Sequence, residues 1–584
     1  MNPLTLHSEP ESQLVHARAT GAVEQLARWG RLGALVVMNL YLISPVLAFE
    51  LALHPARHAA VDKLVLFAAP ASVLGLIVAH LLIRPTILHA LLFPFYLLVA
   101  TDLFVVAEYQ TRLTSSVISV VLENWSDAGG YIEHHRNSIL IAATLVIGFY
   151  AVGMLAIRGI RLRPTRRLRA LAISFLVMVY AAVTIRQAKT LGSITSGAMD
   201  MISHDRSSPF GIFAQGFMAY RVYRVVVEHR RATRDFSFGA TRRATTAEPE
   251  IVVLVIGESV RRDHWSLYGY GRNTTPRLAR EANVVTFRNV VTQAALTQIA
   301  VPLMLTRNTI DRNDIPETSI VTLFGEVGFT THWFSTQQRD QYTGAINRYS
   351  AEADDVRFLN RQHDGALVDL VRSVLVDAPS GAKHFFVLHT QGSHAVYDDR
   401  CPPQHRIFAV GDELSEHERL INSYDNAIAY TDTVLAELIS VLKQRAGIAA
   451  LLYVPDHGEN LKDDARGLLG HFYNNEYDLP IPMAFWYSDS FAARFNAKVA
   501  SMYANATKRV NTQAVFYTLV DAADVSLNDS RMLTASLLSP DWVEVPRRVF
   551  SGWDGANRAR SVDYDAVFGA TSGDPGDQAR IGTR

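Results

Sequence analysis

The chain has 584 residues, no formal net charge and a sequence pI of about 7.4, so its charge gives no indication of nucleic-acid binding. Its hydrophobic content is 49% while its mean hydropathy is only +0.09, a mixture that indicates one very apolar part and one ordinary soluble part. Cys401 is the only cysteine, which excludes an intramolecular disulfide and a cysteine-based zinc site.

Five long apolar segments predict a membrane domain over residues 1–186. They lie at about 32–53, 64–83, 86–106, 138–157 and 168–185. Each is long enough to cross a bilayer, which takes roughly 20 residues of helix. The first is too long for a signal peptide, and no small-residue cleavage site follows it. Soluble core helices are the alternative, but so many nearly uncharged runs in succession favour five spans.

The charge of the loops predicts how these spans are oriented. The loop 158–169 carries six arginines and no acidic residue, so the positive-inside rule places it in the cytoplasm. The loop 107–137 is richer in acidic residues and suits the outer side. With five spans, the N-terminus is cytoplasmic and everything after residue 185 is outside. In a bacterium this describes a multi-pass protein of the inner membrane whose second half lies in the periplasm.

The rest of the chain reads as a connector at 187–249, a soluble catalytic domain at 250–555 and a loosely ordered tail at 556–584. Strand-like runs lie at 251–256, 330–335, 384–389, 449–454 and 481–487. The clearest helix covers 416–446, with Ser415 and Glu418 in capping-box spacing before it and Gly447 after it. Strands that alternate with helices predict an α/β domain with a mostly parallel central sheet flanked by helices.

Polar side chains follow three of the predicted strands. Glu258 comes just after the first, His394 soon after the third, and Asp456 and His457 directly after the fourth. An open α/β sheet binds its ligand at the carboxyl ends of its strands. Carboxylate with imidazole suits zinc or manganese. Taken singly, Glu258 has an alternative interpretation as a capping or salt-bridging residue, and His471, 14 residues beyond His457, as a solvated loop residue.

A nucleophile is expected in the apolar segment 291–305. Thr297 lies at the expected start of a helix there, where free N–H groups and the helix dipole favour an anion. A threonine in this position is ordinarily an N-cap. A metal at Glu258, Asp456 and His457 would instead lower the pKa of the Thr297 hydroxyl and make it a nucleophile.

Together these segments resemble the bacterial phosphoethanolamine transferases, which belong to the alkaline phosphatase and sulfatase superfamily. The resemblance runs in order through about 250–490, over IGESVRRDHWSLYGYGRNTTPRL, NVVTQAALTQIAVP, VLHTQGSHAVY, INSYDNAIAYTDTVLAELISVL and PDHGEN followed by GH. It implies one or two zinc ions and a sulfatase-type fold. It also implies that Glu258, Thr297, Asp456 and His457 bind the zinc and that Thr297 is modified covalently.

The same resemblance implies that His394 and His471 bind the phosphoryl group or a second zinc. Two departures from the family are visible: Ser259 stands where threonine is more usual, and PDHGEN replaces the commoner SDHGE. The disulfides that brace many lipid A-modifying members cannot form, since the chain has a single cysteine. This bears on the acceptor more than on the chemistry.

The implied activity is transfer of phosphoethanolamine from phosphatidylethanolamine to a periplasm-facing glycan, foremost lipid A or lipopolysaccharide core. The expected partners are therefore this donor lipid, the acceptor and the membrane, and no nucleic acid. The sequence argues against a formylglycine sulfatase, since Cys401 is not near the helix that carries Thr297. The alternatives are a glycerol-phosphate transferase or phosphodiesterase of the same superfamily, and an inactive membrane sensor with the same fold.

A further binding residue is expected in the outer loop. The segment 111–125 carries an apolar stripe that ends in Trp125, which suits a helix lying in the membrane interface. Glu123 on this segment is expected to pair with the ammonium of the ethanolamine head group. A solvated glutamate is the alternative, because exposed ion pairs are weak and common.

Overall fold

The computed structural model describes residues 9–53, 63–109, 113, 118, 136–162, 164–191, 208–244, 247–312, 316–337, 346–359, 362–445, 447–471, 473–553 and 559–569. The chain divides into two compact units, Met1–Tyr223 and Arg224–Arg584. Glu123 lies outside the described residues, so its predicted contact stays a prediction.

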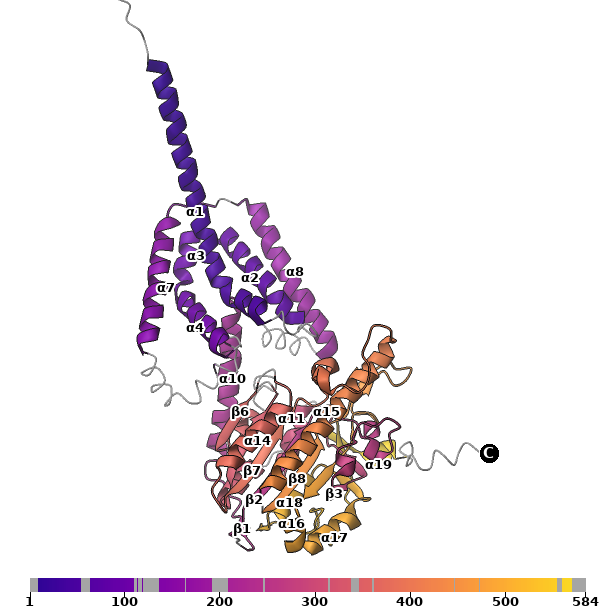
Figure 1. The fold of residues 1–584 in the computed structure, drawn as a ribbon. Helices are drawn as coiled ribbons and strands as arrows, with labels where there is room; N and C mark the ends of the chain where they lie inside the picture. The colour runs from indigo at the N-terminus through magenta and orange to yellow at the C-terminus, as the bar shows by residue number, and fades with distance from the viewer. Residues whose placement is uncertain are drawn as a thin grey trace, which may run out of the picture. The chain divides into compact units, whose positions relative to one another are not determined.

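The first unit is helical (Figure 1). Its helices are α1 (Glu9–Leu53), α2 (Lys63–Leu82), α3 (Pro85–Leu91), α4 (Phe93–Tyr109), α7 (Arg136–Ala156), α8 (Arg166–Leu191) and most of α10 (Gly211–Ala232). Among the described residues, Glu24–Ala48 and Ile139–Ala156 are long and apolar enough to cross a membrane, and the α3–α4 pair, bent by 59°, would add a third. The apolar helices fit a membrane domain, whereas the count of five spans stays a prediction.

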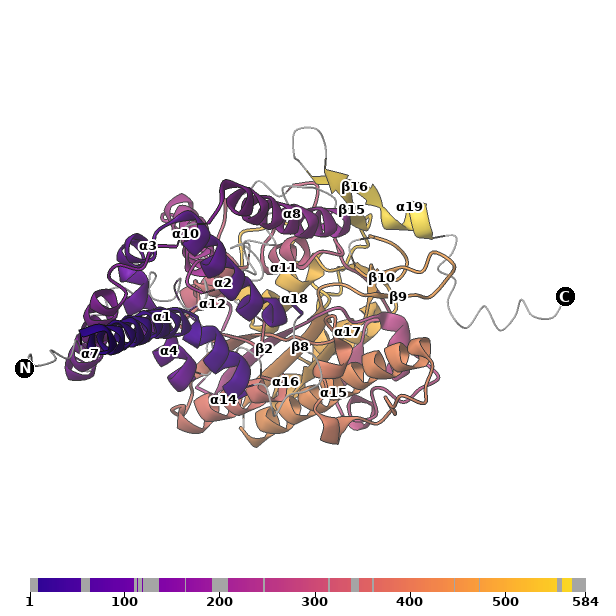
Figure 2. The same cartoon turned by 90° about the horizontal axis from the view of Figure 1, so that it is seen from above.

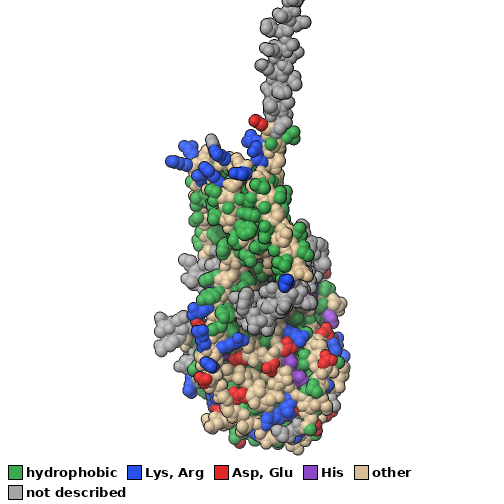
Figure 3. Space-filling view, turned by 90° about the vertical axis from the view of Figure 1, so that its left-hand side faces the viewer, with side chains coloured by type: hydrophobic (Ala, Val, Ile, Leu, Met, Phe, Trp, Pro, Cys, Tyr) green, Lys and Arg blue, Asp and Glu red, His purple; other side chains and the backbone are tan. Residues whose placement is uncertain are grey.

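The surface of the helical unit is apolar over much of its length. Its core packs Met38, Leu42 and Tyr96 together, while α7 exposes Leu145 and Val152. In Figure 3 apolar side chains cover much of the visible face of the helical unit, and basic side chains gather at one of its ends. An apolar exterior of this extent suits lipid and not water.

The second unit is built on a seven-stranded sheet of order β3-β12-β8-β2-β7-β5-β6. Five neighbours, β8, β2, β7, β5 and β6, run parallel, whereas β12 is antiparallel to both β8 and β3. The sheet is therefore mixed and not purely parallel. Its strands are β3 (Val284–Thr286), β12 (Ala484–Tyr487), β8 (Ile448–Pro455), β2 (Glu250–Gly257), β7 (Lys383–His389), β5 (Thr330–Ser335) and β6 (Asp355–Phe358).

One predicted strand is divided in the structure. The run 481–487 becomes β11 (Pro480–Ile481), which pairs with β4 (Asn289–Val291) in a separate three-stranded sheet, and β12, which joins the central sheet. Pro482 lies between the two pieces. Because proline has no N–H to donate to a ladder, it separates the two pairings.

Both faces of the central sheet are covered by helices, as Figures 1 and 2 show. Residues 252, 254 and 256 of β2 pack in the core beside α11 (Thr297–Leu305), α12 (Ile320–Glu326) and α18 (Ala514–Ala522). Residues 251, 253 and 255 pack in the core beside α14 (Gly365–Asp377) and α15 (Glu416–Gln444). Since alternate side chains of a strand point to opposite faces, burial on both sides explains the uninterrupted apolar run.

The remaining elements surround this core. The helices are α13 (Asn347–Ser350), α16 (Asp489–Arg494), α17 (Asn496–Asn505) and α19 (Tyr564–Phe568). The short strands are β1 (Thr241–Arg242), β9 (Asn460–Leu461), β10 (Leu469–Gly470), β13 (Arg509–Asn511), β14 (Val525–Ser526), β15 (Arg548–Trp553) and β16 (Ala559–Asp563). The expected capping box of Ser415 and Glu418 opens α15.

Two elements lie within the stretch 556–584 that was predicted to be a loosely ordered tail. There β16 pairs with β15, and α19 follows it. Tyr564 is buried with Val291, Leu479 and Val549. This apolar contact gives the segment a reason to fold that its polar composition does not reveal.

Candidate active site

The polar residues predicted to form a site follow neighbouring strands of the central sheet. In the ladders, Ile256 of β2 pairs with His389 of β7, and Gly257 pairs with Pro455 of β8. The next residues along the chain, Glu258, Thr390 and Asp456, therefore leave the sheet at the same edge. This is the carboxyl edge, where open α/β sheets bind their ligands.

Glu258 is fully buried and held from several sides. Its Oε1 accepts a hydrogen bond from Ser259 Oγ over 2.8 Å, and its Oε2 accepts one from Gln337 Nε2 over 3.0 Å. Its backbone touches Gly392, where a Cβ atom would lie 2.7 Å from the carbonyl oxygen of Glu258. Gly392 also has a positive φ of 46°, so only glycine fits this close approach.

His457 presents one ring nitrogen to three other predicted site residues. Its Nδ1 lies 2.8 Å from the carbonyl oxygen of Gly458, an acceptor, which places the proton on Nδ1 and leaves Nε2 as a lone-pair donor. Nε2 lies 3.5 Å from Glu258 Oε1, 3.4 Å from Asp456 Oδ2 and 3.3 Å from Thr297 Oγ1. The four residues predicted to hold a metal are thus brought together.

The donor set fits a divalent metal. One oxygen or nitrogen from each of Glu258, Asp456 and His457 lies within 4.8 Å of the others, and all three residues are buried. Asp456 Oδ2 is buried and accepts no hydrogen bond from any described residue. Two carboxylates, an imidazole and a hydroxyl are hard or borderline donors of the kind that bind zinc.

The electrostatics of Glu258, Thr297, Asp456 and His457, together called the cage, also favour a bound cation. Burial, with the adjacent charge of Asp456, raises the pKa of Glu258 well above its usual range. Burial lowers the pKa of His457, which keeps its imidazole neutral and available as a ligand. Buried carboxylates this close repel one another, and a cation between them relieves the repulsion.

Thr297 is the first residue of α11, and Leu296 is the N-cap. The threonine therefore does not cap the helix with its side chain, as the alternative interpretation would have it. Its Oγ1 instead lies 3.4 Å from Glu258 Oε2 and 3.3 Å from His457 Nε2. The hydroxyl is held inside the cage, at a helix start where N–H groups favour negative charge.

His394 and His471 lie beside this cage. Their rings are 6.0 Å apart, and the His471 ring is 4.1 Å from that of His457. Burial, with the charge of Arg400 and the neighbouring histidines, lowers the pKa of His394 to about 3. For His471 burial acts in the same direction, but the hydrogen bond and charge of Glu459 outweigh it and raise the pKa.

Glu459 is a site residue that was not among the predicted ligands. Its Oε2 lies 3.1 Å from His471 Nδ1, and its Oε1 accepts a hydrogen bond from Tyr397 over 3.0 Å. With His457 and His471 it forms a second group whose ligand atoms lie within 4.8 Å of one another. Its place in the PDHGEN segment was the available signal.

Gln337 and Asp364 were also missed. Gln337 follows β5 and bonds to Glu258 and to the carbonyl oxygen of Thr390, the latter over 2.8 Å. Asp364 accepts hydrogen bonds from the backbone N–H groups of Gln391 and Gly392, both over 2.9 Å. These contacts hold the loop after β7. A polar residue just beyond a predicted strand was the only sequence signal for Gln337.

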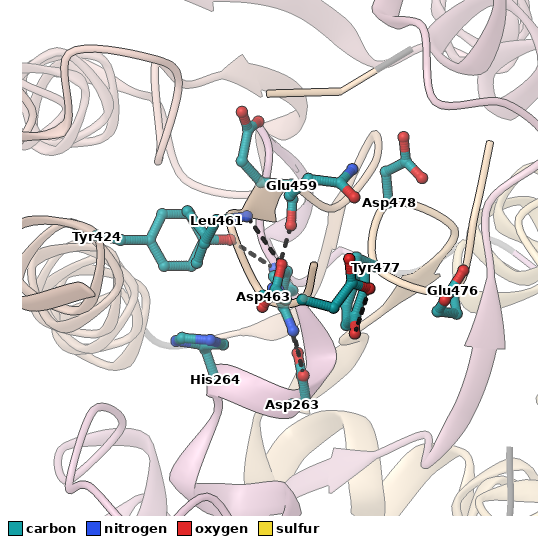
Figure 4. A network of polar contacts seen from close by, with 12 residues as sticks. Asp263, His264, Tyr424, Glu459, Leu461, Asp463, Glu476, Tyr477 and Asp478 are labelled. Carbon is teal, nitrogen blue, oxygen red and sulfur yellow. Dashed lines mark hydrogen bonds and ion pairs between the residues drawn. The ribbon is translucent and has the colours of Figure 1, made fainter. Parts of the chain in front are cut away.

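A buried arginine joins the loops that follow β2 and β8. Arg261 pairs with Asp263 on its own loop and with Asp463 on the other, and the nitrogen–oxygen distance is 2.5 Å in both pairs. Its guanidinium lies 4.7 Å from the centre of the Tyr477 ring. Tyr424 of α15 donates to the carbonyl oxygen of Ser259 over 2.7 Å. Figure 4 shows Asp263, Asp463, Tyr424 and Tyr477 around this network.

Comparison with known proteins gives a consistent picture. The Sulfatase family model matches residues 250–525. The Kdo(2)-lipid A phosphoethanolamine 7''-transferase of Escherichia coli K12 is 26% identical over 425 residues, which cover 66% of this chain and 72% of that protein. The crystal structure of the C-terminal periplasmic domain of EptC from Escherichia coli is 27% identical, covers 57% of this chain and 98% of that one, and gives a TM-score of 0.50. A structure of the same domain in complex with zinc gives a TM-score of 0.49, is 27% identical, and covers 56% of this chain and 95% of that one.

Proposed function

Because the chain belongs to the phosphoethanolamine transferase family of the alkaline phosphatase and sulfatase superfamily, we propose that it transfers phosphoethanolamine from phosphatidylethanolamine to a periplasm-facing glycan. The acceptor we favour is lipid A or the lipopolysaccharide core, and the name of the relative described above gives Kdo(2)-lipid A. The observation that carries the proposal is the Thr297 hydroxyl, held between Glu258 and His457 beside Asp456.

In this proposal Glu258, Thr297, Asp456 and His457 hold a zinc ion. When bound, the cation stabilises the negative charge that develops on the Thr297 oxygen and on the phosphoryl group. The protein's part is to fix the ligands: Ser259 and Gln337 hold the Glu258 carboxylate, and the Gly458 carbonyl sets the His457 tautomer. Such outer contacts orient metal ligands and tune their basicity.

The reaction then has two displacements at phosphorus. First, Thr297 Oγ attacks the donor phosphorus and loses its proton, a P–Oγ bond forms, and the bond to the diacylglycerol oxygen breaks. Diacylglycerol leaves with one proton, and phosphoethanolamine stays on Thr297. Second, an acceptor oxygen attacks the same phosphorus and gives up its proton, and the Thr297 hydroxyl is restored. Splitting the transfer in this way is nucleophilic catalysis.

We assign His394 and His471 to the phosphoryl group of the substrate. Both lie next to the cage, and neither belongs to the group formed by Glu258, Asp456 and His457. In this proposal their ring nitrogens bind phosphoryl oxygens and exchange protons with the departing or attacking oxygen. Occupation of the second group, His457, Glu459 and His471, by another zinc is the alternative role of His471.

The proposal places the protein in the bacterial inner membrane, with a cytoplasmic N-terminus and a periplasmic catalytic unit. The apolar helices supply the membrane attachment. Glu123 is assigned to the ammonium of the ethanolamine head group, as its place in the outer loop suggests.

A transfer assay in vesicles tests the function. Full-length protein is reconstituted with head-group-labelled phosphatidylethanolamine, or in a parallel reaction with head-group-labelled phosphatidylglycerol, and lipid A is added as acceptor. Labelled lipid A together with an equal amount of diacylglycerol is the expected result. Free phosphoethanolamine with no labelled acceptor would indicate a phosphodiesterase, and labelled acceptor only from phosphatidylglycerol a glycerol-phosphate transferase. No turnover of either lipid by zinc-loaded protein would favour the inactive sensor.

A further inference from the structure

Helix α10 begins in the segment expected to be a polar connector, yet its start is built into the helical unit. Ser208 Oγ donates a hydrogen bond to the carbonyl oxygen of Leu42 over 2.7 Å, and the Ser208 N–H donates to Ser72 Oγ over 2.8 Å. Phe210 lies so close to Gly75 that a Cβ atom there would be 3.2 Å from its ring. The chain is thus fixed to α1 and α2 just before α10 starts.

The first half of α10 has two different faces. Gln215, Met218 and Ala219 are buried on one side. On the opposite side Phe213, Phe217 and Tyr220 expose 65%, 50% and 53% of their surface. Their spacing of four and three residues places these three rings, the aromatic stripe, on a single helical face.

The chemistry of this exposed face changes abruptly along the helix. Beyond Tyr220 the exposed positions on the same side are Arg221, Arg224 and Glu228, and Arg224 forms an ion pair with Glu228. From Phe213 to Tyr220 the helix rises roughly 10 Å. An aromatic band of that height that gives way to arginines is the pattern of a helix crossing from the membrane interior into the interface.

We propose that the aromatic stripe contacts phospholipid and that the surface of the bilayer crosses α10 between Tyr220 and Arg224. Another helix of the same unit exposes apolar side chains in the same way. Leu145 of α7 is 68% exposed, and α7 is long and apolar enough to span a membrane. Phe213 is as exposed as Leu145. Tyrosine suits the boundary because its ring is apolar and its hydroxyl reaches water.

The position of this boundary has a consequence for the catalytic unit. That unit begins at Arg224, four residues after Tyr220, which is roughly 6 Å along a helix. In this proposal the chain leaves the bilayer within α10, a few residues before the second unit begins in the sequence. The position of the membrane boundary along α10 does not depend on the reaction proposed above.

Spin labels at single cysteines test it in the full-length protein, reconstituted in vesicles of phosphatidylethanolamine and phosphatidylglycerol. Cys401 does not compete for the label, because it is buried and burial raises the pKa of its thiol to about 12. Labels are introduced by Phe213→Cys, Phe217→Cys, Arg224→Cys and Glu228→Cys. Leu145→Cys serves as the lipid control, and Val376→Cys, an exposed apolar position on α14, as the water control.

The readout is collision of each label with oxygen, which concentrates in lipid, and with a water-soluble nickel chelate. Labels at 213 and 217 should match the Leu145 control, with loss of collision with nickel, and labels at 224 and 228 should match the Val376 control. Nickel access at 213 and 217 would overturn the inference, and so would shielding from both reagents, which would mean that protein covers the stripe. Two positions on each side of the boundary allow for one variant that fails to fold.

Discussion

The side-chain amide of Gln337 donates a hydrogen bond to Oε2 of Glu258 over 3.0 Å. The same nitrogen donates to the carbonyl oxygen of Thr390 over 2.8 Å, so one amide ties the loops after β5 and β7 to the carboxylate at the end of β2. A fully buried carboxylate with a fixed orientation is what a metal cage requires. Gln337 thus acts as a positioning residue for Glu258.

Gln337→Ala should lower zinc affinity and turnover by about 10- to 100-fold, the usual effect of losing a partner of a metal ligand. Zinc content at limiting free zinc, measured together with transfer activity, checks this. Excess zinc should restore part of the activity, which a purely structural role would not permit. Gln444→Ala, at the exposed end of α15, is the matched control. Unchanged zinc affinity in Gln337→Ala would rule out the positioning role.

Removal of a carboxylate from the cage should remove the metal. In Glu258→Ala and Asp456→Ala, zinc measured by elemental analysis should fall from about one ion per chain toward none, with turnover below about 1% of wild type, because catalytic zinc needs its three protein ligands. Circular dichroism should stay unchanged, since the core strands do not rely on these groups. Asp432→Asn removes another buried carboxylate, one that accepts from Arg277 and Leu278 N–H groups, and should retain zinc. Full zinc content in both cage variants would refute the ligand assignment.

Arg261→Lys should loosen the two loops that Arg261 joins. A lysine ammonium keeps the charge but cannot bind Asp263 through two nitrogens while it also reaches Asp463. We expect a loss of about 2 kcal/mol in stability, seen as a lower Tm in detergent, because a buried paired group loses a partner. Arg466→Lys, whose pairs with Asp464 and Glu476 are exposed, should leave the Tm nearly unchanged. Equal effects of the two substitutions would contradict the proposed role of Arg261.

The buried pair His332 and His384 should make the second unit sensitive to acid. Their ring nitrogens lie 3.1 Å apart, and burial, with the charges of His332 and Arg445, lowers the pKa of His384 to about 4 from the ordinary histidine value of about 6.5. Between these values the unfolded chain binds the proton and the folded chain does not. This contribution to stability is therefore present above about pH 6.5 and is lost as the pH falls toward 4.

His384→Gln should flatten that part of the pH dependence, by no more than about 3 kcal/mol between pH 7 and 4. Chemical unfolding of the full-length protein in detergent at several pH values measures it. Parallel curves for wild type and variant across this range would show that His384 makes no such contribution.

Much of the fold follows from local pattern. The apolar run of β2 and the capping box of α15 are set by burial on two faces and by hydrogen bonds between near neighbours, and both appear in the sequence. The division of 481–487 could have been inferred from Pro482 alone. The aromatic stripe of α10 was not anticipated, because its apolar residues are interleaved with arginines and lower the average hydropathy.

The candidate site was predicted in part for a physical reason. Glu258, Asp456 and His457 directly follow strands, and parallel ladders bring such ends together. Gln337 and Asp364 act through loops whose conformation depends on tertiary contacts, which no spacing in the sequence expresses. The same is true of Tyr397, which reaches Glu459 across 62 residues of chain.

The most direct test of the proposed function is mass spectrometry of the full-length protein after incubation with phosphatidylethanolamine and no acceptor. Thr297 Oγ1, held 3.4 Å from Glu258 and 3.3 Å from His457, should carry the phosphoethanolamine group, and addition of lipid A should remove it. Thr297→Ala, with its zinc content checked, should show no adduct. The group on another residue, or lipid A modified by Thr297→Ala as fast as by wild type, would contradict Thr297 as the nucleophile.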